Sequence, residues 1–248
     1  MKKGSIVAKP PPGSESVVEA AAACPYSSGM IRHIVWDWNG TLIDDVPACV
    51  RSLNDMLRKY GRKPVTCRQY RRHFGFPVQD YYVGLGFDFS RENWNTVAAE
   101  FHRFYSGHSR AVRLRKGARD TLRRLHRNGV AMSILSASEI SVLEKMVNER
   151  GIRQFFSGLY GLSDLFARSK MDAGRRLLAG IGLDPAEILL VGDTVHDSEV
   201  ASDMGCRCVL VRGGHQAEDR LVQCGRQILP DVGHVIKYLQ KHTRHKAP

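Results

Sequence analysis

From Ile31 onward, short apolar runs alternate with segments whose apolar residues recur at helical spacing. This alternation is typical of an α/β fold, in which a mainly parallel sheet carries helices on its faces. The predicted strands are Ile31–Asp37, Val130–Leu135, a short strand near Leu159, Ile188–Val191 and Cys208–Val211. The predicted helices are Gly117–Asn128, Ser138–Glu149, Met171–Ala179, Asp197–Met204 and a last helix around Val232–Leu239. A chain of 248 residues, 43% of them apolar, is long enough to bury the core of such a fold.

A helical segment interrupts the alternation after the first strand. The apolar residues of Val46–Leu57 recur at helical spacing, and so do those of Trp94–Tyr105, which follow Ser90 as the expected helix cap. We therefore predict a helical domain over residues 45–115, inserted into an α/β core domain of residues 30–44 and 116–240. The core of the inserted domain itself is expected to contain Trp94, Phe101 and Tyr105.

The two ends of the chain differ from this pattern. Residues 1–29 are rich in proline and alanine and show no sustained period, which predicts a disordered extension. Residues 241–248 form a basic tail without acidic residues. The sequence shows neither a convincing signal peptide nor an apolar run of the roughly 18 residues that a membrane span needs, so no membrane association is expected.

The net charge of +12 raises the question of nucleic-acid binding. About half of the excess lies between residues 44 and 115, but no nucleic-acid motif is present and the basic cluster is not interleaved with aromatics. The basic residues are either solvated helix faces or the source of a field that gathers small anionic substrates. Six cysteines without CxxC spacing favour a reducing compartment, and hence the cytoplasm. The oligomeric state stays unknown.

Polar residues follow several of the predicted strands at the point where each strand ends. In a parallel α/β sheet, ligands bind beyond the carboxyl ends of the strands, so these residues are expected to converge at one edge. Any one of them taken alone is also explained as a turn, a helix cap or a surface residue. The converging residues are Asp37, Asn39, Gly40 and Thr41 after the first strand, Ser136 and Ala137 after the second, Lys170 at a helix start, and Asp193 and Asp197 after the fourth.

This order of acid, hydroxyl, lysine and paired acids resembles the four signature motifs of the haloacid dehalogenase superfamily, and the match covers nearly everything after Met30. The resemblance implies a Rossmann-like core and a Mg²⁺-dependent phosphatase. Asp37 would attack phosphorus and form an acyl phosphate that water cleaves. Asp37, the backbone carbonyl of Asn39 and Asp193 would hold Mg²⁺, with Asp197 binding through water or steadying the site.

The resemblance also implies a set of phosphate contacts. Ser136 would donate a hydrogen bond to the phosphoryl oxygens, with Ala137 beside it, and Lys170 would neutralise charge on the nucleophile and the phosphate. Gly40 lets the backbone approach the ligand, and Thr41 would offer its amide and hydroxyl.

Asn39 departs from the pattern of this superfamily. Most of its phosphatases carry a second Asp at this position, which serves as general acid and then general base, whereas an amide neither releases nor accepts a proton near neutral pH. Three explanations compete: substrates that leave without protonation, a substitute such as His196 or a histidine of the inserted domain, or the loss of catalysis.

The inserted domain resembles the helical cap of phosphoglycolate phosphatase and β-phosphoglucomutase relatives. The stretch 72–77 (RHFGFP) resembles the cap loop that selects the substrate in that group, with Gly75 in its turn. Arg71, Arg72 and His73 are either ligands for a carboxylate or second anionic group, or exposed side chains.

The sequence therefore predicts hydrolysis of a small phosphomonoester, with phosphoglycolate indicated by resemblance alone. The partner would be a small phosphorylated metabolite, and nucleic acid is not expected. The alternatives are a catalytically weakened phosphate-binding or regulatory protein, and a phosphonate hydrolase or sugar phosphomutase of the same fold.

Overall fold

The computed structural model of the chain describes residues 31–162 and 170–243. The predicted disordered extension of residues 1–29 and residues 244–248 of the predicted basic tail lie outside the described residues.

A parallel six-stranded sheet in the order β3-β2-β1-β4-β5-β6 forms the centre of the molecule. The predicted α/β fold with a parallel, Rossmann-like sheet is therefore confirmed. The chain moves outward from β1 in both directions, first to β2 and later to β4, and such a switch opens a crevice at the carboxyl ends of these strands. The strands are β1 His33–Trp36, β2 Ala131–Glu139, β3 Gly158–Leu162, β4 Ile188–Gly192, β5 Arg207–Val211 and β6 Gln227–Leu229.

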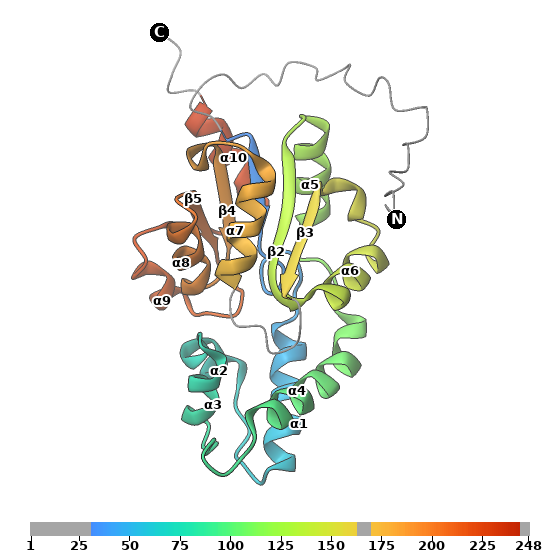
Figure 1. The fold of residues 1–248 in the computed structure, drawn as a ribbon, viewed down its shortest axis with the longest axis vertical. Coiled ribbons are helices and arrows are strands. Elements are labelled where there is room, and N and C mark those ends of the chain that lie inside the picture. The colour runs from blue at the N-terminus through green and yellow to red at the C-terminus, as the bar shows by residue number, and fades with distance from the viewer. Residues whose placement is uncertain (1–30, 163–169, 244–248) are drawn as a thin grey trace, which may run out of the picture.

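Helices cover both faces of this sheet (Figure 1). Successive side chains of a strand point to opposite faces, so Ile34 and Trp36 of β1 belong to one apolar cluster and Val35 to the other. Helices α5 Ala118–Arg127, α6 Ile140–Glu149 and α10 His234–Thr243 are on the first side, and α7 Lys170–Ile181, α8 Val195–Asp203 and α9 Glu218–Val222 on the second. Short 3₁₀ helices η2 Arg153–Phe155 and η3 Pro185–Glu187 precede β3 and β4.

Four further helices form a helical layer beyond the carboxyl ends of the strands, towards which the arrow of β3 points in Figure 1. This layer has its own apolar cluster, which includes Leu53, Met56, Tyr82 and Val97. The helices are α1 Val46–Lys59, α2 Cys67–His73, α3 Val78–Gly84 and α4 Trp94–His108, followed by the 3₁₀ helix η1 Ser109–Ala111.

The start of α4 differs from the prediction. Asn93, not Ser90, caps the helix, and its side-chain oxygen accepts a hydrogen bond from the Thr96 amide at 3.1 Å. Ser90 instead donates to Asp88 at 2.6 Å, within the preceding turn. Both residue types are good caps, so composition alone did not distinguish between them.

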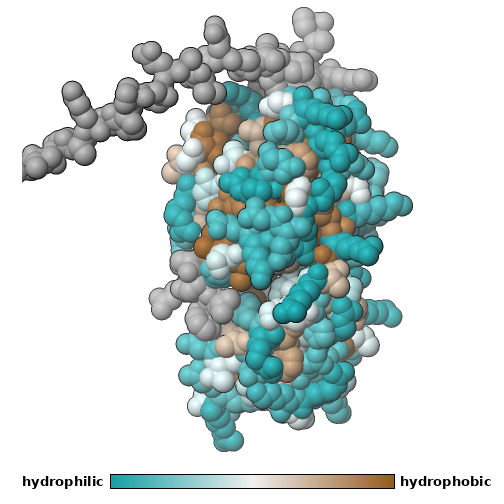
Figure 2. Space-filling view, turned by 90° about the vertical axis from the view of Figure 1, so that its right-hand side faces the viewer, coloured by the Kyte–Doolittle hydropathy of each residue, from teal (hydrophilic) through white to brown (hydrophobic). Residues whose placement is uncertain are grey.

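Hydrophilic side chains cover most of the molecular face shown in Figure 2, over the sheet region and over the helical layer alike. Within the described residues, no helix combines the length and the apolar character that crossing a membrane requires.

Candidate active site

The loop after β1 brings Asp37 to the carboxyl edge of the sheet. Asp37 continues the strand, since its amide donates to the Val191 carbonyl at 2.9 Å. Gly40 follows with φ +76°, and a Cβ atom there would lie 2.5 Å from Asp193 Oδ2, so the close approach of the two loops requires glycine. The buried Thr41 hydroxyl donates to Asp193 Oδ1 at 2.7 Å. This hydroxyl therefore positions Asp193, and its predicted contact with substrate stays a prediction.

The end of β4 and the start of α8 form the second part of the site. The amides of Asp193 and Thr194 donate to Asp197 Oδ2 at 3.1 and 3.0 Å, and the Thr194 hydroxyl donates to the same oxygen at 2.7 Å. Thr194 and Asp197 together form a capping box at the start of α8. These bonds fix the Asp197 carboxylate while its other oxygen faces the site.

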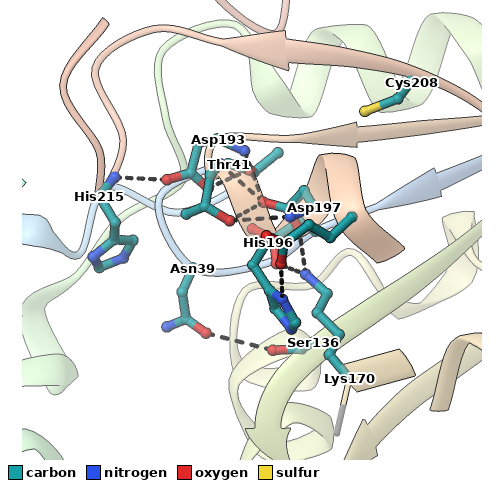
Figure 3. Close-up of polar contacts among 12 residues, drawn as sticks. Asn39, Thr41, Ser136, Lys170, Asp193, His196, Asp197, Cys208 and His215 are labelled. Atoms are coloured by element: carbon teal, nitrogen blue, oxygen red, sulfur yellow. Dashed lines mark hydrogen bonds and ion pairs between the residues drawn. The ribbon is translucent and has the colours of Figure 1, made fainter. Parts of the chain in front are cut away.

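Lys170, at the start of α7, is buried between two of the acids. Its ammonium group donates to Asp197 Oδ1 at 2.6 Å (Figure 3). It also donates to Asp37 Oδ1. Burial by itself would lower the pKa of Lys170, but the charges of Asp197 and Asp37 outweigh it and raise this pKa. Lys170 therefore carries a positive charge beside the Asp37 carboxylate.

Three buried carboxylates, those of Asp37, Asp193 and Asp197, each offer an oxygen within 4.8 Å of the others. Burial first, and then the neighbouring acids, raise the pKa of Asp37 well above its ordinary value, although Lys170 opposes this shift. The second oxygen of Asp37, Oδ2, is buried without a hydrogen-bond partner. Excess negative charge, hard oxygen atoms and an unsatisfied carboxylate oxygen together fit a divalent cation such as Mg²⁺.

The Asn39 side chain is held in place on both sides. Its Nδ2 donates to Asp45 Oδ2 at 2.8 Å and to the Tyr105 hydroxyl at 3.2 Å, while its Oδ1 accepts from the Ser138 hydroxyl at 2.8 Å. Ser136, buried within β2, lies 3.4 Å from the same Oδ1. Asp45, Tyr105 and Ser138 were not predicted as site residues.

Asp45 and His215 form a buried pair beside Asn39 that the sequence analysis also missed. Asp45 Oδ1 accepts from the Gly40 amide at 2.8 Å and lies 3.2 Å from His215 Nε2. The other ring nitrogen of His215 lies 2.8 Å from the Tyr70 hydroxyl. The backbone amide of His215 donates to Asp193 Oδ2 at 2.6 Å. His215 thus connects the helical layer with an acid of the candidate metal site.

The charges of this pair shift the pKa values of both partners. Burial alone would lower the pKa of His215, but Asp45 raises it to about 9. Burial alone would raise the pKa of Asp45, but His215 and the hydrogen bonds from Asn39 and Tyr105 lower it to about 2. The pair is therefore an ion pair at neutral pH. One signal existed in the sequence, because His215 follows the last residue of β5 by four positions, at the same edge as the other site residues.

His196, the substitute considered for the missing acid, is paired with Glu199. Its Nδ1 lies 3.0 Å from Glu199, and its ring stacks on Phe76 at 4.5 Å between centroids. The described hydrogen bonds of His196 reach none of the three clustered acids.

The residues of the predicted substrate loop differ in their surroundings. Arg71 donates to the carbonyls of Gly214 at 2.9 Å and Gly213 at 3.0 Å, so it fastens α2 to the loop after β5. Arg72 and His73 are exposed, and neither they nor Gly75 line the cavity above the acids. The side chains of this loop that do line the cavity are aromatic or cyclic, namely Phe74, Phe76 and Pro77.

A cavity of about 690 Å³ extends from Asp37 and Lys170 into the helical layer. The predicted Ala137 lines it, beside Ser138. Trp94, Phe101 and Tyr105 line it as well as packing against the core of the helical layer, which corrects their assignment to that core alone.

Known proteins resemble the chain in both sequence and structure. The family model of haloacid dehalogenase-like hydrolases matches residues 34–211. Phosphoglycolate phosphatase 1 of Pseudomonas aeruginosa is 25% identical over 208 residues, which span 79% of the chain and 75% of that protein. A phosphoglycolate phosphatase of Aliivibrio fischeri is 26% identical over 220 residues, which span 84% of the chain and 95% of that protein.

Solved structures share the fold of the chain. A haloacid dehalogenase-like hydrolase from Streptococcus pneumoniae superposes with a TM-score of 0.70 at 21% identity, covering 85% of the chain and 99% of that structure. CbbY from Rhodobacter sphaeroides, solved in complex with phosphate, superposes with a TM-score of 0.66 at 16% identity, covering 83% of the chain and 96% of that structure. The chain belongs to the haloacid dehalogenase-like hydrolase family. The predicted family is therefore confirmed, and the relatives named above include phosphatases.

Proposed function

We propose that the chain hydrolyses a phosphomonoester with Mg²⁺ as cofactor, through a phosphoaspartyl intermediate on Asp37. The observation that carries the proposal is the buried Asp37 carboxylate, which has one oxygen on Lys170 and the other without a partner. Such a carboxylate is held for attack on a phosphorus atom placed beside Lys170.

Each neighbouring residue has a part in this proposal. Mg²⁺ would be held by Asp37, Asp193 and the backbone carbonyl of Asn39, and it would neutralise charge on the phosphoryl oxygens. Asp197 would hold Lys170 in place. Ser136 and the backbone at Ala137 would bind phosphoryl oxygens at the end of β2. The helical domain of residues 45–115 would exclude water from the site during phosphoryl transfer. A cytoplasmic location is part of the same proposal, supported by five free cysteines in the described residues.

The test is release of inorganic phosphate from a panel of phosphomonoesters, measured with and without Mg²⁺. Asp37→Asn is expected to lower turnover by at least about 10³-fold, because the amide is not a nucleophile. Asp44→Asn is the matched control, since Asp44 is exposed in the same loop and is expected to leave turnover unchanged.

The outcome also decides the competing proposal of a regulatory phosphate-binding protein. Wild type that binds phosphate but releases none from any ester, with or without Mg²⁺, would contradict the enzymatic proposal. Phosphoglycolate belongs in the panel because the relatives are named for it.

A further inference from the structure

The cavity above Asp37 is much larger than a two-carbon acid needs. At about 690 Å³ it lies in the range of roughly 300–1,000 Å³ that accommodates drug-sized ligands. It begins at Asp37 and Lys170, where the phosphoryl group would lie, and ends among the helices of the helical layer. The leaving group of the ester would occupy this space.

Aromatic rings form the wall of the cavity opposite the acids. Phe74 directly follows α2, Tyr81 and Tyr82 belong to α3, and Trp94 and Phe101 belong to α4. Trp94 lies 5.5 Å from the ring of Tyr82, and Phe101 stacks on Tyr105 at 5.9 Å, both measured between centroids. Such a wall favours a flat, apolar group that stacks or packs edge to face.

The charges on the cavity wall do not favour a second anionic group. Lys170 is the one Lys or Arg among the described residues that line the cavity, and it is already paired with Asp37 and Asp197. Three histidines of the described residues line the cavity: His215 is paired with Asp45, His196 is paired with Glu199, and burial lowers the pKa of His102, which keeps that ring neutral. Glu139 and Glu199 add negative charge to the wall. Within the part of the wall that the structure describes, a carboxylate such as that of phosphoglycolate would meet no Lys or Arg besides Lys170.

Asn39 limits which leaving groups can depart, independently of the shape and charge of the cavity. Its amide supplies no proton, and its hydrogen-bonding groups are already engaged by Asp45, Tyr105 and Ser138. An alkyl alcohol, with a pKa near that of water at about 15.7, is a poor leaving group without a proton donor. A phenolic oxygen, with a pKa of about 10, leaves as the anion far more readily.

From these two observations we infer that the substrates are phosphomonoesters of aryl alcohols, with the aryl ring seated against Trp94 and Phe101. This inference rests on the proposed phosphatase activity. A carboxylate oxygen of Asp37 bonds to phosphorus while the bond from phosphorus to the aryl oxygen breaks, and its electron pair leaves with the phenolate. Water then attacks phosphorus, the bond to Asp37 breaks, and orthophosphate retains both protons of that water.

The experiment compares 1-naphthyl phosphate, benzyl phosphate and phosphoglycolate as substrates, with Mg²⁺ present. Benzyl phosphate carries an aromatic ring on an alkyl oxygen, so it separates ring binding from leaving-group chemistry. We expect kcat/KM to fall in that order, with KM similar for the two aromatic esters and kcat lower for benzyl phosphate by about 10² or more.

Variants of the cavity wall test the seating of the ring. Trp94→Ala and Phe101→Ala are each expected to raise KM for 1-naphthyl phosphate about tenfold while changing KM for phosphoglycolate little. Phe104→Ala is the matched control, because Phe104 lies on the same helix, packs against the helical layer and does not line the cavity. Unfolding midpoints of all three variants show whether each is folded.

Binding measured without turnover gives a second readout. Titration calorimetry on Asp37→Asn with Mg²⁺ is expected to give at least about tenfold tighter binding of 1-naphthyl phosphate than of inorganic phosphate, because only the ester contacts the aromatic wall. Equal affinities would overturn the inference, as would efficient hydrolysis of phosphoglycolate beside slow hydrolysis of the aryl ester. Failure to hydrolyse any ester would instead contradict the proposed function.

Discussion

Asn39 occupies the position of the usual acid, and its side chain donates a hydrogen bond to Asp45 at 2.8 Å. Substituting Asp for Asn39 therefore tests what the missing acid would contribute. Asn39→Asp would place a second carboxylate within hydrogen-bonding distance of Asp45, and two carboxylates that share a site raise the pKa of one of them. We expect the variant to hydrolyse benzyl phosphate about 10²-fold faster than wild type at acidic to neutral pH, with the gain lost as pH rises. Steady-state rates between pH 5 and 9 measure this effect.

The control exchanges the two residues. Asn39→Asp combined with Asp45→Asn restores one carboxylate and one amide, so the double variant is expected to be more stable than Asn39→Asp alone. The double variant also removes the charged partner of His215. The single variant Asp45→Asn measures how much this loss lowers the free energy of unfolding. Additive free energies of unfolding across this cycle would contradict direct coupling between the two side chains.

At the scale of elements, α2 is fastened to the loop after β5 by backbone contacts. Arg71 donates to two carbonyls of that loop, and the Ala217 amide donates to the Arg71 carbonyl at 2.9 Å. Arg71→Ala is expected to lower the free energy of unfolding by about 1–2 kcal/mol, a value reduced by the partial exposure of the guanidinium. Urea unfolding measures this change, with the neighbouring exposed Arg72→Ala as control; equal effects of the two substitutions would contradict the role given to Arg71.

The elements that the sequence predicted are those with a strong local pattern. The strands β1, β4 and β5 and the first part of β2 are buried, largely apolar runs. Asp37 and Asp193 were found because they follow such strands, and Ser136 because it follows the apolar run that ends at Leu135 within β2. Strand β6, only three residues long, and α9, only five, are too short to show a period, and both were missed.

Residues that depend on contacts distant in sequence were predicted less well. Asp45 and His215 are 170 positions apart and meet only because α1 and the loop after β5 pack together. Arg71 and Arg72 are equivalent by type, and only the packing of α2 decides that one contacts backbone and the other solvent. The aromatic residues of α4 have the spacing of a helix core, which does not reveal that part of this core is the wall of a cavity.

At the scale of the whole molecule, His215 joins the sheet region to the helical layer through Asp45 and the Tyr70 hydroxyl. The pKa of His215 rises from an ordinary value of 6.5 to about 9, so the folded protein binds a proton between these values that the unfolded chain releases. The stabilisation is therefore complete below pH 6.5 and is lost as pH rises through about 9, by roughly 3 kcal/mol in all. At the acid end, the pKa of Asp45 is lowered from 3.8 to about 2 by folding. The stabilisation from this pair is therefore lost as pH falls from 3.8 through about 2, where Asp45 becomes protonated in the folded protein.

Urea unfolding of the metal-free protein at pH 6 and pH 9.5 measures the alkaline loss. His215→Gln is expected to remove most of this pH dependence, whereas His126→Gln, which changes an exposed histidine of α5, should keep it. Because the pair lies between the two parts of the molecule, hydrogen exchange at alkaline pH should increase in α2 before it increases in β1 and β4, whose strands are fully buried in the sheet. An identical pH dependence in wild type and His215→Gln would mean that some other group sets the alkaline limit of stability.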